Sequence, residues 1–188
     1  EEKKTSTNFG TAVGHGSIRL AAMGFDARKP TDAEMKHMKT LLRQALEDGA
    51  FCLSSGLIYP PGCYADTAEL AELCRELVPF GAFYETHMRD EGEGVVEAVK
   101  EALEIAERSG APLQISHHKV TRKSVWQVHC RTTIALMEQA RRRGLDVKAD
   151  QYPYSASATT LDSNVPLWAF EGGVDSMISR LTDPEQRK

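Results

Sequence analysis

The sequence predicts an α/β fold in which parallel strands alternate with helices. Two observations carry this prediction. Five short apolar runs occur along the chain, and each is followed by a polar loop and a segment with the apolar spacing of a helix. Strands and helices that alternate in this way form βα units with right-handed crossovers, so that all strands run in the same direction.

The first unit contains an apolar run over residues 11–18 and a helix that is expected to begin near Thr31. Thr31 and Glu34 have the spacing of a capping box, in which each side chain bonds the backbone N–H of the other residue. Gly49 is expected to end this helix. The apolar residues between these ends follow helical spacing: Met35, Met38, Leu41, Leu42, Ala45 and Leu46.

The second and third units repeat the pattern. Residues 50–58 form the second predicted strand, and a Pro-Pro-Gly loop separates it from a predicted helix over residues 68–77. Residues 82–87 form the third predicted strand. Its helix spans roughly residues 95–109, and Gly110 follows as the stop signal.

The fourth and fifth predicted strands lie in residues 112–117 and 145–152. The helix between them carries apolar residues over 134–140 and ends at Gly144. After the fifth strand the pattern weakens into a loop, and only a short helix over residues 174–181 is expected.

Two ways of closing such a sheet are open. One is an open doubly wound sheet, and the other is a (β/α)₈ barrel, which usually needs about 250 residues. The five units of this 188-residue chain are too few for a closed barrel. No Gly-x-Gly-x-x-Gly or Walker loop follows any predicted strand, so a nucleotide-binding sheet lacks its signature.

The composition argues against several classes of partner. The chain is 41% hydrophobic and 27% charged with a formal net charge of −4, so neither nucleic acid nor an anionic membrane is an expected partner. It contains no apolar run long enough to span a bilayer and no signal-peptide pattern. The four cysteines show no Cys-x-x-Cys pairing, so we expect reduced thiols that fill the core of a cytoplasmic protein.

Polar side chains gather where the third, fourth and fifth predicted strands end. The three segments are residues 85–89, 116–119 and 150–154. In parallel α/β folds the carboxyl ends of the strands meet at one edge, and the loops that follow build the active site there. We therefore expect a functional site at this edge.

Two of these strand ends carry histidines, His87 and His117, at a spacing that suits one βα repeat. Because side chains alternate along a strand, His117 is expected to point the same way as Lys119, and His118 the other way, into the helix layer. This favours His117 over His118 as a metal ligand. Two neutral imidazoles make half of a zinc site, which needs at least three protein ligands. Ordinary hydrogen-bonded histidines are the alternative.

Two further residues have an open role. His15 lies between two glycines at the end of the first apolar run, where function and packing are both plausible. Glu85 is a candidate for orienting His87, with a structural role as the alternative.

Five stretches that occur in order closely resemble the D-aminoacylase (N-acyl-D-amino-acid deacylase) family of the amidohydrolase superfamily. They cover about residues 8–165. One stretch alone would be weak evidence, whereas five in family order are specific. The stretches are 13–16 (VGHG), 53–62 (LSSGLIYPPG), 84–91 (YETHMRDE), 115–119 (ISHHK) and 152–154 (YPY).

The resemblance implies a partial (β/α)₈ TIM barrel in which this chain supplies units three to seven. Residues 8–165 would be the central part of the barrel, and residues 166–188 a loop and a short helix. The implied activity is that of a metal-dependent hydrolase of linear amide bonds, which removes the acyl group from small-molecule N-acyl-D-amino acids.

The resemblance also implies roles for five residues. His87 and His117 would bind zinc at one tight site of the full-length protein, with room for a second, weaker site. Tyr59 and Lys119 would bind the substrate, the lysine by offering its charge to a carboxylate. Tyr152 would polarise the substrate carbonyl, because a phenol can donate to a developing oxyanion.

Parts of the family's machinery lie outside this chain. These are a His-x-His pair on strand one, a bridging cysteine on strand two, and the aspartate on strand eight that shuttles the proton. Where the family often has a serine after the Tyr-Pro-Tyr stretch, this chain has Ala158. We therefore expect the piece alone to be inactive and to self-associate through exposed barrel edges.

Two alternatives to this function remain. A cyclic-amide hydrolase, similar to dihydroorotase or hydantoinase, would bridge two metals with a carboxylated lysine on strand four of the barrel. Strand four of the barrel corresponds to the second predicted strand of this chain, which ends with Ser54-Ser55-Gly56 and contains no lysine. The other alternative is a non-catalytic α/β binding module that keeps the two histidines for structure.

Overall fold

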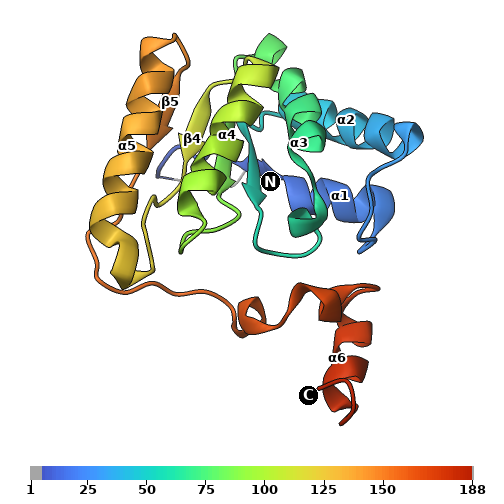
Figure 1. Ribbon diagram of the computed structural model, residues 1–188. Helices are drawn as coiled ribbons and strands as arrows, with labels where there is room; N and C mark the ends of the chain where they lie inside the picture. The colour runs from blue at the N-terminus through green and yellow to red at the C-terminus, as the bar shows by residue number, and fades with distance from the viewer. Residues whose placement is uncertain (1–5, 188) are drawn as a thin grey trace.

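The computed structural model describes residues 6–187 and contains a five-stranded parallel sheet (Figure 1). Its strands follow chain order, and each pairs in parallel with the next. This confirms the predicted α/β class with successive βα units. The strands are β1 (Ala12–Gly14), β2 (Cys52–Gly56), β3 (Phe83–His87), β4 (Leu113–Ile115) and β5 (Val147–Ala149).

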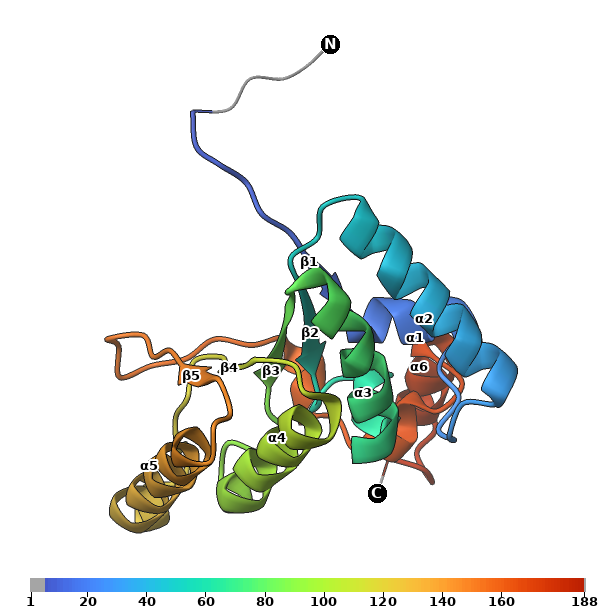
Figure 2. The ribbon, with the colours of Figure 1, turned by 90° about the horizontal axis from the view of Figure 1, so that it is seen from above.

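Helices cover one face of this sheet, and the view from above shows α2 to α5 side by side along it (Figure 2). The last helix, α6, lies apart from them near the C-terminus (Figure 1). No helix in the described part of the chain is long and apolar enough to cross a membrane. The helices are α1 (His15–Met23), α2 (Asp32–Glu47), α3 (Thr67–Cys74), α4 (Val95–Ser109), α5 (Trp126–Arg142) and α6 (Val174–Thr182).

Most predicted helix ends are confirmed. Thr31 caps α2, with both bonds of the capping box to Glu34 present. Gly110 follows α4 with a φ of 78°, a left-handed conformation that glycine adopts without steric cost. The residues beyond β5 form loops and two 3₁₀ turns, Leu161–Asn164 and Leu167–Phe170, before α6.

The first unit differs from its prediction, because only residues 12–14 of the expected strand over 11–18 are extended. The chain turns into α1 at His15 instead. His15, Ile18, Arg19 and Met23 are all buried on one face of this helix. Their spacing of three, four and eight residues is that of a helix, so helical periodicity outweighs the apolar character of the run.

The two faces of the sheet have opposite character. Leu53, Tyr84 and Leu113 lie side by side in register on the face beneath the helices and are almost fully buried. Glu85 and Gln114 pair on the opposite face, which carries polar side chains and no helix among residues 6–187 (Figure 2). In a (β/α)₈ barrel this second face points into the barrel. With helices on one face only among the described residues, the sheet is thus arranged like a barrel wall.

A buried ion network ties the first unit to the second. Arg19 of α1 is fully buried and pairs with Glu69 of α3, which also accepts a bond from His15 Nε2 at 2.9 Å. The Arg19 guanidinium also donates to the backbone oxygens of Asp26 and Arg28, at 3.1 and 2.6 Å. His15 is therefore a packing residue in this structure and lies outside the strand-end cluster described below.

We expect the change Glu69→Ala to lower the free energy of unfolding by about 3–5 kcal/mol, because it leaves the Arg19 charge buried without a negatively charged partner. Urea unfolding followed by circular dichroism measures this loss. Glu72→Ala on the same helix is the matched control, since the Glu72 side chain is 44% exposed and pairs with Lys39 at the surface. Similar losses in the two variants would contradict the argument.

Candidate metal centre

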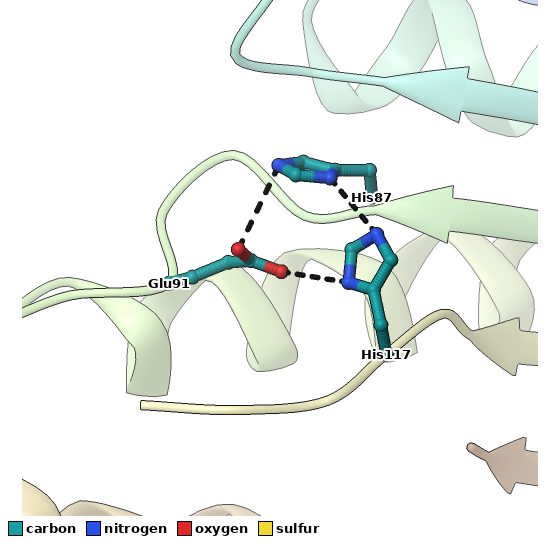
Figure 3. A group of neighbouring side chains, drawn as sticks. All are labelled: His87, Glu91 and His117. Atoms are coloured by element: carbon teal, nitrogen blue, oxygen red, sulfur yellow. Dashed lines mark hydrogen bonds and ion pairs between the residues drawn. The ribbon is translucent and has the colours of Figure 1, made fainter. Parts of the chain in front are cut away.

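The ends of β3 and β4 bring His87 and His117 into contact. His87 is the last residue of β3, and His117 follows β4 by two residues. Nδ1 of His87 lies 3.0 Å from Nε2 of His117, and the ring centroids are 4.7 Å apart in an edge-to-face arrangement (Figure 3). The sequence prediction that these histidines share one edge of the sheet is confirmed.

Glu91, in the loop after β3, closes the group from the other side. Its Oε1 lies 3.0 Å from Nδ1 of His117, and its Oε2 lies 3.8 Å from Nε2 of His87 (Figure 3). Each of the three residues offers one ligand atom, and these atoms lie within 4.8 Å of one another. Strand periodicity could not identify Glu91, because it lies in a loop; its only signal was its place in the matched stretch over residues 84–91.

Lys119 joins the same cluster. Its Nζ lies 2.7 Å from Oε1 of Glu91 and 2.9 Å from Nδ1 of His117. It also donates to the backbone oxygen of His117 at 3.2 Å. The expectation that His117 and Lys119 point together is therefore confirmed.

The reason for this orientation differs from the simple alternation that predicted it. Ile115 is buried on the face beneath the helices, so alternation alone would send His117, two residues on, to that same face. His117 instead has a φ of 40°, the only positive φ at a non-glycine residue within 6–187. The left-handed conformation destabilises the fold by about 1–3 kcal/mol, and it directs the imidazole of His117 toward His87. His118 then faces α5, where its Nε2 lies 3.0 Å from Oγ1 of Thr133.

The electrostatics keep His87 neutral. Burial is the main cause that holds the pKa of the His87 imidazole below its usual value, and Glu91 opposes it. His117 and Lys119 lower that pKa further. A neutral imidazole keeps a lone pair on one nitrogen, which is the form that binds a metal.

The donor set fits a metal ion such as zinc. Two nitrogens on a tetrahedral zinc ion are about 3.3 Å apart, given Zn–N distances of about 2.0–2.1 Å. The 3.0 Å between the facing nitrogens of His87 and His117 is close to that value. Imidazole and carboxylate are both ordinary zinc ligands.

Tyr59 and Tyr152, to which the resemblance assigns substrate contacts, both lie near this group. The Tyr59 ring centroid is 5.4 Å from that of His87, and its hydroxyl shares a 2.7 Å hydrogen bond with Thr159. Nζ of Lys119 lies 5.6 Å from the centre of the Tyr152 ring. The Thr159 hydroxyl thus stands next to the position where this chain lacks the expected serine.

The hydrogen bonds of the Glu85 side chain lead away from this group. Its carboxylate accepts bonds from Ser116 Oγ at 2.7 Å and Cys52 Sγ at 3.7 Å. Burial and the neighbouring carboxylate raise the pKa of the Cys52 thiol to about 12, so this thiol stays protonated. Glu85 therefore links strands β2, β3 and β4 on the open face, which favours the structural interpretation.

Comparison with known proteins gives several close relatives, although no family model matches the chain. An N-acyl-D-glutamate deacylase of Alcaligenes xylosoxydans xylosoxydans is 40% identical over 161 residues, which are 86% of this chain and 33% of that protein. The structure of an N-acyl-D-glutamate deacylase from Bordetella bronchiseptica, with zinc and a phosphonate inhibitor, has a TM-score of 0.73 and 40% identity. That match covers 77% of this chain and 30% of the solved chain.

A second solved structure, of a D-aminoacylase that defines a subset of amidohydrolases, is 41% identical with a TM-score of 0.71. That match covers 76% of this chain and 30% of the solved chain. The chain thus spans about a third of the length of the proteins it matches. The fold is a partial (β/α)₈ barrel like that of these solved amidohydrolases. Within that class, the resemblance to the D-aminoacylase family is confirmed.

The two adjacent histidines should differ in their effect on metal binding. We expect His117→Ala to abolish tight zinc binding, because its imidazole faces His87. His118→Ala should keep zinc and lose about 1–3 kcal/mol of stability, because its imidazole bonds Thr133. Metal analysis and thermal unfolding of both variants of the full-length protein would check this. Zinc loss in the His118 variant alone would contradict the assignment.

Proposed function

We propose that the protein carrying this chain is a zinc hydrolase that removes the acyl group from the nitrogen of N-acyl-D-amino acids. The observation that carries this proposal is the facing pair of imidazoles at the strand ends, with Glu91 behind them. The likeness to N-acyl-D-glutamate deacylase and D-aminoacylase supports the same reaction. Because the chain spans a third of those proteins, other parts of the full-length protein must supply the remaining groups.

In this proposal, His87 would hold zinc through Nδ1 and His117 would hold it through Nε2, the two nitrogens that face each other. Glu91 then orients the rings from behind, since its carboxylate lies against the two remaining nitrogens. With Nε2 of His117 on the metal, its Nδ1 would carry the proton and donate to Glu91, which fixes the tautomer and the ring direction. The Lys119 ammonium, which can only donate, would then pair with Glu91 rather than with this nitrogen. The bound ion would supply Lewis acidity toward an amide carbonyl and toward water.

Lys119, Tyr59 and Tyr152 bind the substrate in this proposal. Lys119 offers an ammonium group beside the two histidines, and Glu91 balances its charge in the absence of a substrate carboxylate. Tyr59 lies over His87 and Tyr152 lies beside Lys119, so both phenols border the space where an acyl group would be held. We assign Tyr152 the polarisation of the carbonyl, because a phenol donates to a developing oxyanion.

We further propose that residues 8–165 are the central part of the barrel and that residues 166–188 are a loop and a short helix beside it. The outer edges of β1 and β5 have no partner strand among residues 6–187, and the face that would line the barrel has no cover. Such edges favour self-association of the isolated piece. The four free cysteines support a cytoplasmic location.

The two alternatives have less support. A cyclic-amide hydrolase of the dihydroorotase or hydantoinase kind would need its bridging lysine on β2, which ends in Ser54-Ser55-Gly56. A binding module without catalysis gives no reason for two imidazoles, a carboxylate and a lysine to gather at the strand ends. We therefore prefer the deacylase.

The direct test is hydrolysis of N-acetyl-D-methionine and N-acetyl-D-glutamate by the full-length protein with stoichiometric zinc. We expect release of the free D-amino acid, loss of activity after chelation, and recovery on adding zinc back. The 188-residue piece alone should release nothing, because it lacks the other ligands. Activity that survives complete removal of the metal would contradict the proposal, and so would hydrolysis confined to cyclic amides.

The role of Lys119 has its own test. We expect Lys119→Met to raise KM for N-acyl-D-amino acids by about 10-fold or more, since a charge-assisted bond is worth about 1.5–3 kcal/mol. KM for the corresponding uncharged amides should change far less, because they bring no carboxylate to the lysine. Steady-state kinetics on the matched pair of substrates would check this. Equal effects on both would show that Lys119 is structural.

A further inference from the structure

Asp150, the residue that follows β5, brackets the turn that carries His117. One carboxylate oxygen, Oδ2, accepts a hydrogen bond from the backbone N–H of His117 at 3.0 Å. The other, Oδ1, accepts one from Nε2 of Gln114 at 2.7 Å. Both oxygens of Asp150 are thus held by β4 and by the turn that follows it.

This bond is made to the backbone of His117, which is the one non-glycine residue within 6–187 with a left-handed conformation. An L-residue adopts this conformation only where its surroundings stabilise it. The same conformation cancels the strand alternation and directs the imidazole of His117 toward His87 and Glu91. Two side chains bond the backbone of His117: the Asp150 carboxylate accepts from its N–H, and the Lys119 ammonium donates to its carbonyl oxygen.

We propose that Asp150 is a positioning residue for the metal centre. Its carboxylate keeps His117 in the left-handed conformation that turns the imidazole into the site, and Gln114 fixes the carboxylate in turn. This inference rests on the proposed function only in taking His117 as a metal ligand. Asp150 itself lies outside the group of side chains that could hold the ion.

The Asp150 side chain is separable from the pairing of β4 with β5. The backbone N–H of Asp150 donates to the oxygen of Ile115 at 3.2 Å, and its own oxygen accepts from the N–H of His118 at 2.8 Å. Both bonds survive truncation of the side chain. Removing the carboxylate should therefore release the His117 N–H while the strand pair stays intact.

The test compares zinc affinity in the full-length protein and its Asp150→Ala variant, measured by competition with a chromophoric chelator. We expect a 10- to 100-fold loss of affinity, the usual effect of removing a group that orients a ligand. Asp146→Ala is the matched control at the other end of β5, because its exposed carboxylate pairs only with Lys148 in the recorded contacts. It should change the affinity less than two-fold.

A double-mutant cycle separates positioning from general destabilisation. In a His117→Ala background, Asp150→Ala should cause no further loss of the weak zinc affinity that remains, because the residue that it positions is already gone. An equal loss in both backgrounds would overturn the proposal. Unchanged affinity in the single variant would overturn it as well.

A crystal structure of the Asp150→Ala variant gives a readout that needs no metal. We expect His117 to leave the left-handed region and its ring to turn away from His87. A ring that still lies about 3 Å from His87, with φ positive, would overturn the proposal. If the wild-type protein binds no zinc, the proposed function fails, and this crystal structure alone still decides whether Asp150 positions His117.

Discussion

The contact between His87 and His117 depends on a local break in strand geometry. Regular alternation beyond β4 would bury the imidazole of His117 beneath the helices, next to Ile115. The left-handed conformation at His117 reverses this parity, so its ring meets His87 at 3.0 Å while His118 faces α5. The approach of Glu91 and Lys119 follows from that placement, because both contact Nδ1 of His117.

The fold was predictable because its signals are local and repeated. Five apolar runs alternate with helical patterns, and the cap at Thr31 and the stop at Gly110 mark helix ends that the structure reproduces. The failure at residues 11–18 has a physical cause, since a short apolar run fits both a buried strand and a buried helix face. The buried face of α1 has helical spacing, and the ion pair of Arg19 with Glu69, fifty residues away in sequence, holds that helix in place through a contact that no local pattern encodes.

The site was predictable in part. Its histidines, lysine and tyrosines stand at strand ends or in matched stretches, so sequence reasoning could collect them. Glu91 and Asp150 were missed as site residues because each acts through contacts that no periodicity encodes. Glu91 lies in a loop and contacts two imidazoles, whereas Asp150 accepts a hydrogen bond from the backbone N–H of His117 in the neighbouring unit. The correct orientation of His117 was predicted from alternation that the structure does not follow at this point.

The central claim is that the facing nitrogens of His87 and His117 bind zinc, and anomalous X-ray diffraction at the zinc edge tests it most directly. Crystals of the full-length protein grown with zinc should show a peak about 2.0–2.1 Å from both of these nitrogens. Glu91 should remain against the opposite side of the rings, as it lies now. A zinc peak elsewhere, with the two imidazoles still hydrogen-bonded to each other, would contradict the account.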